Sequence, residues 1–337
     1  MAILDFGSAP DDFCVGQIAI AANNHWFTSA TYIPSDCPVG AQMGLGDVTL
    51  YDGRKLIAPS AAADIWASWS LYAPNFSLYT NAVLFEIRNG STPIWRCRWT
   101  SSDELQMQSY NGSSWSNQGS PSSVVTKSTV NRFDLRINLD GASGNIDLYI
   151  NGVSEISISG DTIPDATGTW DEFILGNGYA IASTSTAYFL IWSEVFLADE
   201  DTRDIKMLEV AVDGNGNYTA WSGDYLDVDN ATALGDDSSI YTTASGNRES
   251  FTCASLSATY NSGYDVLAVG VKARAVKQPG SDDIQLMVRS GTTDSDSTAI
   301  STNTLLDRVT ALWANDPNTA SAWTYANADS AEVGVYS

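Results

Sequence analysis

General acid–base chemistry in this sequence would depend on one side chain, because His25 is the only histidine among 337 residues. A Ser-His-Asp or Cys-His arrangement would have to use it. The neighbouring Trp26 and Phe27 are typical of a core or a strand edge, so we expect a structural or solvent-exposed role for His25. A zinc site needs three or four His, Cys or carboxylate ligands at suitable spacing, and the sequence contains no such cluster.

Paired carboxylates offer a second catalytic route, because glycoside hydrolases use two of them across the scissile bond. A strand with Glu, Asp and Glu at alternating positions would indicate such a site, but no E-x-D-x-x-E run occurs. Asp165–Trp170 is similar to a sialidase Asp-box turn, although it has an extra residue between Asp and Gly and occurs once. We therefore predict that the chain is not an enzyme, with a glycan-cleaving activity as the remote alternative.

Acidic residues in the second half of the chain suggest a calcium site. Asp213, Asn215 and Asn217 occupy positions 1, 3 and 5 of an EF-hand-like spacing, with Asp224 at position 12. Position 6 is Tyr218, where the sharp turn requires glycine, and the bidentate Glu is missing. A second acidic segment contains Asp227, Asp229, Asp236 and Asp237. We expect solvated acidic loops and no cofactor, with calcium as the alternative: it is the one ion that either segment could bind.

Tryptophan rings offer a site for sugars, because a flat apolar ring can stack on the face of a pyranose. The candidates are Trp95, Trp99, Trp115 and Trp170, and Trp115 stands out because it lies in the polar run NGSSWSN. Packing in a sandwich core or a subunit contact is the alternative role of such rings. We expect such packing for most of these rings, with Trp115 and Trp170 as the candidate glycan-binding residues.

The elements that carry these side chains are predicted to be β-strands. Apolar and polar residues alternate with a period of two through most of the chain, and the intervening runs are rich in turn residues. Asn-Gly pairs at Asn89, Asn111 and Asn151 supply the positive φ that tight hairpins need. Clear strand patterns are Ala67–Tyr72, Ala82–Arg88, Ile94–Trp99, Glu104–Tyr110, Arg132–Leu139, Asn145–Ile150 and Tyr188–Leu197. An all-β sandwich or jelly roll is therefore predicted.

The charge balance excludes two classes of partner. The chain has 40 acidic and 16 basic residues, a formal charge of -24, and no Lys/Arg cluster. Such a chain repels nucleic acid and anionic membranes. No apolar window is long enough for a transmembrane helix, and the first residues lack the features of a signal peptide. We expect neither nucleic acid nor membrane as a partner.

The four cysteines are scattered and show no metal-ligand spacing. We predict reduced, mostly buried thiols, and Cys14 and Cys37 are the only pair close enough in sequence to consider for a disulfide. The remaining two are Cys97 and Cys253.

Two stretches resemble known proteins. Arg132–Ile158 reads strand, glycine-bearing turn, strand, Asn-Gly turn, strand, and it resembles the hairpin of laminin-G-like and concanavalin A-like jelly rolls. The run that begins at Ser193 is similar to a junction of tailed-bacteriophage virion proteins, and the C-terminus resembles the ending of the same proteins. The matching positions are Ser193, Glu194, Val195, Ala198–Arg203, Trp221, Gly223, Tyr225, Val228, Asp229, Trp313, Asn315, Asp316, Pro317, Thr319, Trp323, Thr324, Gly334 and Val335.

The resemblances imply a concanavalin A-like jelly roll over residues 1–203 and a second β-sandwich virion domain over 204–337. They also imply a structural component of a phage particle, displayed at the virion surface as a head decoration, head fibre or tail-associated protein. Such a protein is assembled in the host cytoplasm and released by lysis. Expected partners are other virion proteins and further copies of the chain. A host-surface glycan-binding adhesin is the alternative function.

Overall fold

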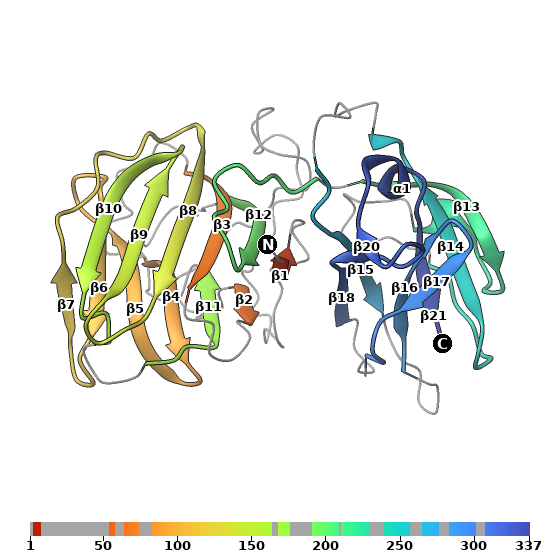
Figure 1. Cartoon of the computed structure of the whole chain (residues 1–337), viewed down its shortest axis with the longest axis horizontal. Helices are drawn as coiled ribbons and strands as arrows, with labels where there is room; N and C mark the ends of the chain where they lie inside the picture. Colours follow the sequence, from red (N-terminus) through yellow and green to blue (C-terminus); the bar gives the residue numbers. More distant parts are fainter. Residues whose placement is uncertain are drawn as a thin grey trace, which may run out of the picture. The chain divides into compact units, whose positions relative to one another are not determined.

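The structure is a computed structural model of the chain. It describes residues 3–7, 54–57, 64–73, 83–163, 168–175, 191–208, 210–228, 239–256, 265–275, 283–300 and 307–337. Two compact units are present, Ile3–Met207 and Leu208–Ser337. Nearly all regular structure is β, which confirms the predicted all-β class (Figure 1). No helix within these residues has the length and hydropathy to cross a membrane.

The first unit is a sandwich of two six-stranded antiparallel sheets. Sheet A has the order β1 (Ile3–Gly7), β12 (Ile191–Ala198), β3 (Ile65–Tyr72), β8 (Val130–Asn138), β9 (Gly144–Ile150) and β10 (Val153–Gly160). Sheet B has the order β2 (Arg54–Ile57), β11 (Glu172–Leu175), β4 (Val83–Asn89), β5 (Thr92–Trp99), β6 (Leu105–Tyr110) and β7 (Trp115–Gln118). The predicted jelly-roll sandwich is confirmed.

An aromatic cluster joins the two sheets of the first unit. From sheet A, the ring of Trp69 stacks on that of Phe133 with centroids 5.4 Å apart. From sheet B, Phe85 and Phe173 contact the same indole at 5.5 and 5.6 Å. All four side chains are fully buried, because alternate residues of each strand point toward the facing sheet. The large apolar area that these rings remove from water is a main source of the unit's stability.

In all three predicted Asn-Gly turns the glycine has the positive φ that the dipeptide favours. In the turn between β9 and β10, both Asn151 and Gly152 have positive φ, at 52° and 79°. Gly90, between β4 and β5, also has positive φ. The hairpin from β9 to β10 is the stretch that resembles laminin-G-like jelly rolls, and its strands pair from Val153 opposite Ile150 to Gly160 opposite Gly144.

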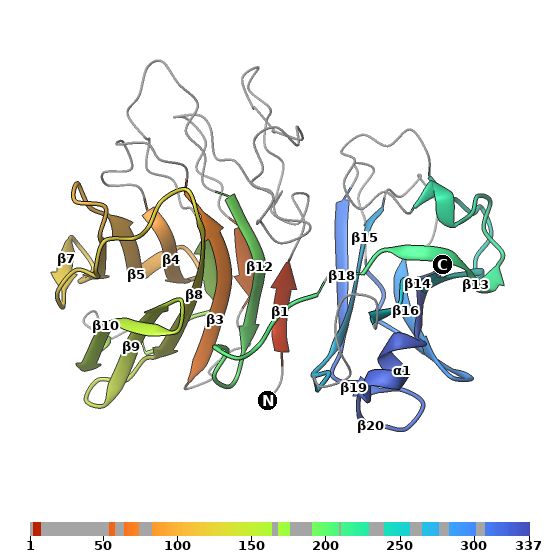
Figure 2. The ribbon, with the colours of Figure 1, turned by 90° about the horizontal axis from the view of Figure 1, so that it is seen from above.

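The second unit is built around a five-stranded antiparallel sheet, named sheet C. Its order is β13 (Val212–Thr219), β14 (Arg248–Cys253), β21 (Glu332–Tyr336), β16 (Gln285–Ser290) and β17 (Thr293–Asp296). The pair β15 (Val269–Ala275) and β18 (Asp307–Trp313) forms a layer beside it (Figure 2). Short elements complete the unit: η2 (Tyr225–Asp227), β19 (Asn315–Asp316), β20 (Ser321–Ala322) and α1 (Tyr325–Asp329).

The core of the second unit lies between sheet C and the β15–β18 pair. Leu286 and Val288 of β16 and Val335 of β21 face Val271 and Val309 across this interface. The same cluster contains two tryptophans of the C-terminal motif, Trp313 and Trp323. The indole N–H of Trp323 donates to the carbonyl of Trp313 at 2.9 Å. These motif tryptophans therefore act as core residues.

Asp316 of the same motif organises the loop that closes the second unit. Its buried carboxylate accepts hydrogen bonds from the backbone N–H of Asn318 at 2.9 Å, the Thr319 hydroxyl at 3.1 Å and the Asn327 amide at 2.6 Å. Burial acts to raise the pKa of Asp316, but bonds from Ser290 and these three residues bring it below its ordinary value. These hydrogen bonds stabilise the carboxylate of Asp316 in its charged form and hold the loop in place.

The junction motif that follows β12 is held against the outer face of sheet A. The Thr202 hydroxyl donates to the buried carboxylate of Asp134 at 2.8 Å, and Ser68 donates to the same oxygen at 2.8 Å. The guanidinium carbon of Arg203 lies 4.6 Å from the centroid of the Tyr149 ring. Both motif residues therefore have structural partners within the first unit.

Several predicted features lie outside the described residues: His25, Cys14, Cys37, Asp165, Asp229, Asp236 and Asp237. Of the remaining cysteines, Cys97 is a free thiol in the core of the first unit and Cys253 is a free, half-buried thiol. Burial raises the pKa of both thiols, and that of Cys253 reaches about 11. A thiol with so high a pKa is a poor nucleophile, because the thiolate is the reactive form.

Candidate functional site

A row of polar side chains crosses the outer face of sheet B. Glu86 of β4 stands opposite Arg96 of β5, Arg96 opposite Gln108 of β6, and Gln108 opposite Asn117 of β7. Residues directly opposite each other on neighbouring strands point to the same side of a sheet. The adjacent side chains in sequence point into the core, as Cys97 does. The polar row, Glu86–Arg96–Gln108–Asn117, therefore faces away from the core.

Hydrogen bonds run along the polar row. The Nε of Arg96 donates to Oε1 of Gln108 at 2.7 Å, and the amide nitrogen of Gln108 donates to Oδ1 of Asn117 at 2.7 Å. At the other end, Arg88 donates to the carboxylate of Glu86. Arg96, Gln108 and Glu86 are nearly buried, whereas Asn117 is exposed. Because buried polar groups are stable only with partners, these bonds fix the orientation of each side chain.

Two aromatic rings stand at the exposed end of the polar row. Tyr110, the last residue of β6, pairs with Trp115, the first of β7, and their ring centroids are 5.2 Å apart. The guanidinium carbon of Arg96 lies 4.1 Å from the centroid of the Trp115 ring. Both rings are half-buried, so part of each is open to solvent. This group of Arg96, Gln108, Tyr110, Trp115 and Asn117 is named the aromatic–arginine site.

The turn between β6 and β7 positions the aromatic–arginine site. The side-chain oxygen of Asn111 accepts hydrogen bonds from the backbone N–H groups of Ser113 and Ser114, at 3.1 and 2.9 Å. Gly112 has a φ of 85°, a conformation that glycine adopts without strain. An Asn side chain that bonds to the backbone in this way makes an Asx turn. Residue types of the NGSSW run thus bring Tyr110 and Trp115 opposite each other.

The site has the chemical groups that bind sugars. The indole ring of Trp115 offers a flat apolar face and Asn117 offers an exposed amide, while the bonds along the polar row hold these two side chains in place before a ligand arrives. Binding sites commonly combine an aromatic surface with a few oriented polar groups in this way. Preorganisation lowers the entropy cost of binding.

The candidate sugar-binding tryptophans differ in their exposure to solvent. Trp115 lies in the aromatic–arginine site. The prediction that Trp170 binds a glycan is corrected. Its side chain is 4% exposed and packs in the core of the first unit, so its ring offers no face for a sugar. Trp95 and Trp99 are also core residues, and the indole N–H of Trp95 donates to the carbonyl of Thr162 at 2.8 Å.

The predicted calcium loop is corrected, because Asp213, Asn215 and Asn217 lie on strand β13. Alternate residues of a strand are about 7 Å apart, too far for one ion to be bound by all three. Each also has another partner: Asp213 accepts from Thr252, Asn215 from the N–H of Tyr225, and Asn217 donates to Glu332.

Asp227 is placed by a capping interaction, since its carboxylate accepts from the backbone N–H of Asp224 at 3.0 Å. Among the described residues, no group of three or more His, Cys, Asp or Glu side chains lies close enough to hold a metal ion.

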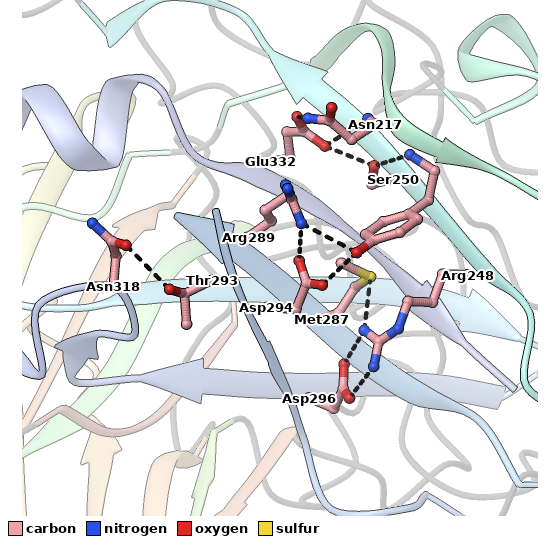
Figure 3. Close-up of polar contacts among 11 residues, drawn as sticks. Asn217, Arg248, Ser250, Met287, Arg289, Thr293, Asp294, Asp296, Asn318 and Glu332 are labelled. Carbon is pink, nitrogen blue, oxygen red and sulfur yellow. Dashed lines mark hydrogen bonds and ion pairs between the residues drawn. The ribbon is translucent and has the colours of Figure 1, made fainter. Parts of the chain in front are cut away.

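A second polar face lies on the outside of sheet C (Figure 3). Arg248 makes a bidentate ion pair with Asp296, with N–O distances of 2.6 and 2.5 Å. Arg289 donates to Asp294 at 2.6 Å, and Asp294 also accepts from the hydroxyl of Tyr218 at 2.5 Å. The hydrogen bond to Asp294 raises the pKa of Tyr218. This group of Tyr218, Arg248, Arg289, Asp294 and Asp296 is named the ion-pair face.

The ion-pair face continues to a third carboxylate at Glu332. The hydroxyl of Ser250 donates to Glu332 at 2.7 Å (Figure 3). A Cβ at Gly216 would overlap the side-chain oxygens of both partners, so any larger residue there would displace this hydrogen bond. Each arginine that Figure 3 draws on this face has a carboxylate partner within the same face. The arrangement is that of a self-contained structural network.

Sequence reasoning found Trp115 but missed Arg96, Gln108 and Asn117. The signal was present in the alternating arginines of IWRCRW and the alternating glutamines of LQMQSY. Polar residues at every second position of two strands indicate one polar sheet face, even when the core residues between them are the more obvious pattern.

Comparisons with known proteins show similarity of fold. The chain matches no protein-family model and no curated protein sequence. Among solved structures it is similar to alginate lyase Aly36B bound to an alginate tetrasaccharide, with 15% identity over 49% of this chain and 81% of the other, and a TM-score of 0.37. A galectin, LEC-6 of Caenorhabditis elegans, is 9% identical over 46% and 95% of the two chains, with a TM-score of 0.31. A sialidase of Trypanosoma rangeli is 12% identical over 48% and 26%, with a TM-score of 0.34.

These similarities overturn the prediction that the chain is not an enzyme. That prediction took one histidine and the missing E-x-D-x-x-E run as grounds to exclude catalysis. Proteins named as alginate lyases and sialidases are among the structures of similar fold, so the exclusion is wrong. At 9 to 15% identity the likeness shows the fold alone and assigns no reaction to this chain.

Proposed function

We propose that this chain binds glycans through the aromatic–arginine site of its first unit, and that it does so as a surface component of a bacteriophage particle. The observation that carries glycan binding is the placement of Trp115. Its half-buried ring lies beside Tyr110, at the exposed end of a row of hydrogen-bonded polar side chains. A sugar stacked on the indole would have the amide of Asn117 within reach for a hydrogen bond.

The site fits a sugar better than it fits a protein partner of ordinary size. Its aromatic surface is limited to two rings, and the groups beside them are amides and a guanidinium, which match hydroxyl-rich ligands. A stable protein interface usually needs an apolar centre of several residues. Directed polar groups around one aromatic ring are therefore better suited to a small, polar, ring-shaped ligand.

Replacing Trp115 tests the glycan proposal. Trp115→Ala removes the ring and is expected to weaken binding to glycans about tenfold or more, equivalent to ~1.4 kcal/mol. Binding of the full chain and the variant to a glycan array and to host cells provides the measurement.

Tyr241→Ala is the matched control, because Tyr241 is an exposed aromatic residue of the second unit. Binding that survives in Trp115→Ala, or that falls equally in the control, would count against the site. Unfolding curves of both variants check that neither change disrupts the fold.

The virion setting is supported by the sequence resemblance around residues 193–229 and 313–335. In the structure, the motif residues Thr202, Asp316 and Trp323 form internal contacts of their own units. Motif residues that make such internal contacts are expected to recur in proteins of the same fold. This is consistent with the proposed membership of the virion proteins that have the motif. Contacts with other virion proteins and self-association remain predictions.

Mass spectrometry of purified phage particles tests the virion setting. Peptides of this chain are expected at a constant ratio to a major capsid or tail protein, and the ratio gives the copy number. If density-purified particles lack the chain, while the lysate contains it, the virion proposal fails and glycan binding is left standing on its own test.

A further inference from the structure

We infer that Asn111 is a site of spontaneous modification, at which the side-chain amide deamidates to aspartate and isoaspartate. In this reaction the backbone nitrogen of Gly112 attacks Cγ of Asn111, and the bond from Cγ to Nδ2 breaks. The proton that the glycine nitrogen gives up to water is returned by water to Nδ2, which leaves as ammonia. A second water molecule then opens the succinimide ring at either carbonyl, which yields aspartate or isoaspartate.

Four hydrogen-bond donors converge on the carbonyl oxygen that becomes an oxyanion in this reaction. Oδ1 of Asn111 accepts from the backbone N–H groups of Ser113 and Ser114, at 3.1 and 2.9 Å, and from their hydroxyls, at 2.9 and 3.4 Å. Donors arranged in this way stabilise the negative charge that develops when a nucleophile adds to a carbonyl. The turn therefore favours attack on Cγ of Asn111.

The same hydrogen bonds hold the side chain beside its nucleophile. An Asx turn folds the carboxamide back over the residues that follow it, and Gly112 lies between the two residues that the bond to Ser113 joins. Among the described residues, neither the N–H of Gly112 nor Nδ2 of Asn111 has a hydrogen-bond partner. Both residues are exposed, so water can take the proton from one nitrogen and protonate the other.

The turn at Asn89 ties the corresponding groups to a distant segment. Nδ2 of Asn89 donates to the carbonyl and the hydroxyl of Thr169, at 3.0 and 2.7 Å. The N–H of Gly90 donates to the carboxylate of Asp171 at 2.8 Å, which holds the proton that the reaction must remove. The leaving group and the nucleophile are both engaged, so the folded chain protects Asn89.

The turn at Asn151 holds its side chain across the sheet. Oδ1 of Asn151 accepts from the backbone N–H of Arg132 at 2.9 Å, and Nδ2 donates to Asn131 at 3.0 Å. A hydrogen bond that has to break before attack slows the reaction roughly fivefold. We therefore expect Asn111 to be modified faster than Asn89 and Asn151, by about tenfold or more after correction for sequence context.

Modification at Asn111 would alter the turn that positions the rings of the aromatic–arginine site. Isoaspartate routes the main chain through the former side chain, which lengthens the backbone between Tyr110 and Trp115. The rings would then lose their fixed placement, and glycan affinity would fall. This consequence rests on the proposed function, whereas the reaction at Asn111 does not.

Peptide mass spectrometry of the full chain, aged at mildly alkaline pH, tests the reaction. Deamidation at Asn89, Asn111 and Asn151 is followed in the folded chain and in guanidinium chloride, and the ratio of the folded to the unfolded rate removes the effect of neighbouring residue types. The ratio at Asn111 is expected to exceed the other two by about tenfold or more, with isoaspartate as a product. A ratio at Asn111 no higher than that at Asn151 overturns the inference.

Asn111→Gln tests the consequence, because an added methylene forces closure to a larger ring that forms far more slowly. Asn151→Gln is the matched control. With age, the wild type and Asn151→Gln should lose glycan affinity in proportion to isoaspartate at position 111, and Asn111→Gln should not. Isoaspartate without loss of affinity, or equal loss in all three chains, overturns the consequence for the site. If the fresh chain binds no glycan, the proposed function is refuted and the rate ratios alone decide the modification.

Discussion

The two units each present a polar face on the outside of an antiparallel sheet, and the two faces balance charge in different ways. On the ion-pair face of sheet C, Arg248 and Arg289 each pair with an aspartate of β17. On sheet B, Arg96 lies between a glutamine and a tryptophan ring. The first arrangement neutralises itself within the protein. The second holds Arg96 by a hydrogen bond to Gln108 and places it beside a half-exposed ring.

This difference contrasts a face whose charges pair with each other with a face that is proposed to bind a ligand. Ion pairs across the strands of one sheet add to its stability, but the paired charges neutralise each other. A change on the ion-pair face should therefore reduce stability without affecting binding, and a change in the aromatic–arginine site should do the reverse.

The largest expected effect comes from Gly334→Ala, at the centre of sheet C. A Cβ at this position would overlap the backbone oxygen of Glu249, so β21 and β14 would have to separate. We expect a loss of about 3 kcal/mol or more in the stability of the second unit, since overpacking against backbone leaves little room to adjust. Hydrogen exchange of peptides from β14 and β21 provides the measurement.

Gly141→Ala is the control for this change, because its Cβ would make only ordinary contacts with Ile163. Unchanged exchange in β14 of the Gly334→Ala variant would mean that sheet C is not packed as described. Glycan binding by the first unit should persist in both variants.

The next effect concerns Asp316 and pH. The folded-state pKa of Asp316 lies below its ordinary value of 3.8, so its contribution is present above pH ~3.8 and is lost as pH falls through the folded pKa. Asp316→Asn replaces the carboxylate oxygen that accepts from Thr319 and Asn327 with an amide NH2 group, so donor faces donor. The change should cost about 1–3 kcal/mol of stability near neutral pH. It should also reduce the acid-induced loss of stability, as measured by urea unfolding from about pH 2 to 7.

Asp213→Asn serves as the control for Asp316, because it removes the same charge from an exposed position of the second unit. Its stability at neutral pH should change little. If Asp316→Asn retains the full acid dependence of the wild type, Asp294, whose pKa is also lowered, becomes the main source of that dependence.

A smaller effect is expected from Arg248→Gln on the ion-pair face. The change removes a bidentate pair with Asp296 and the contact with the ring of Tyr336 at 4.4 Å. Because both partners are partly exposed to water, the expected loss is about 1 kcal/mol. Urea unfolding measures it, and glycan affinity measured on the same sample should not change. A fall in glycan affinity would show that the two faces are not separate in function.

The sequence predicted local features of the site and missed the features that depend on pairing between strands. The strand over Ile94–Trp99 follows from alternation within the segment. The polar row does not, because it depends on Glu86, Arg96 and Gln108 meeting across three strands in one register. Sequence patterns specify which residues share a face of one strand, whereas register is set by packing of the whole sheet.

The incorrect predictions have the same physical origin. Asp213 to Asn217 looked like an ion-binding loop because Asp, Asn and Gly alternate there. In the structure the glycines of this strand lie close to side chains of the neighbouring strand, since a Cβ at Gly214 would lie 2.7 Å from the Thr252 hydroxyl. The burial of Trp170 likewise depends on which elements pack over it. Both outcomes are decided by contacts between residues far apart in the chain.

The smallest expected effect tests how the turn at Asn111 positions the aromatic rings. Asn111→Ala removes the acceptor for the N–H groups of Ser113 and Ser114, at a cost of about 0.5–1 kcal/mol in stability. Because Tyr110 and Trp115 flank this turn, the rings lose part of their fixed placement, and glycan affinity should fall roughly threefold. Asn111→Asp keeps an acceptor oxygen and should retain wild-type affinity. If Ala and Asp variants bind equally well, strand pairing alone holds the rings, and the turn contributes nothing to recognition.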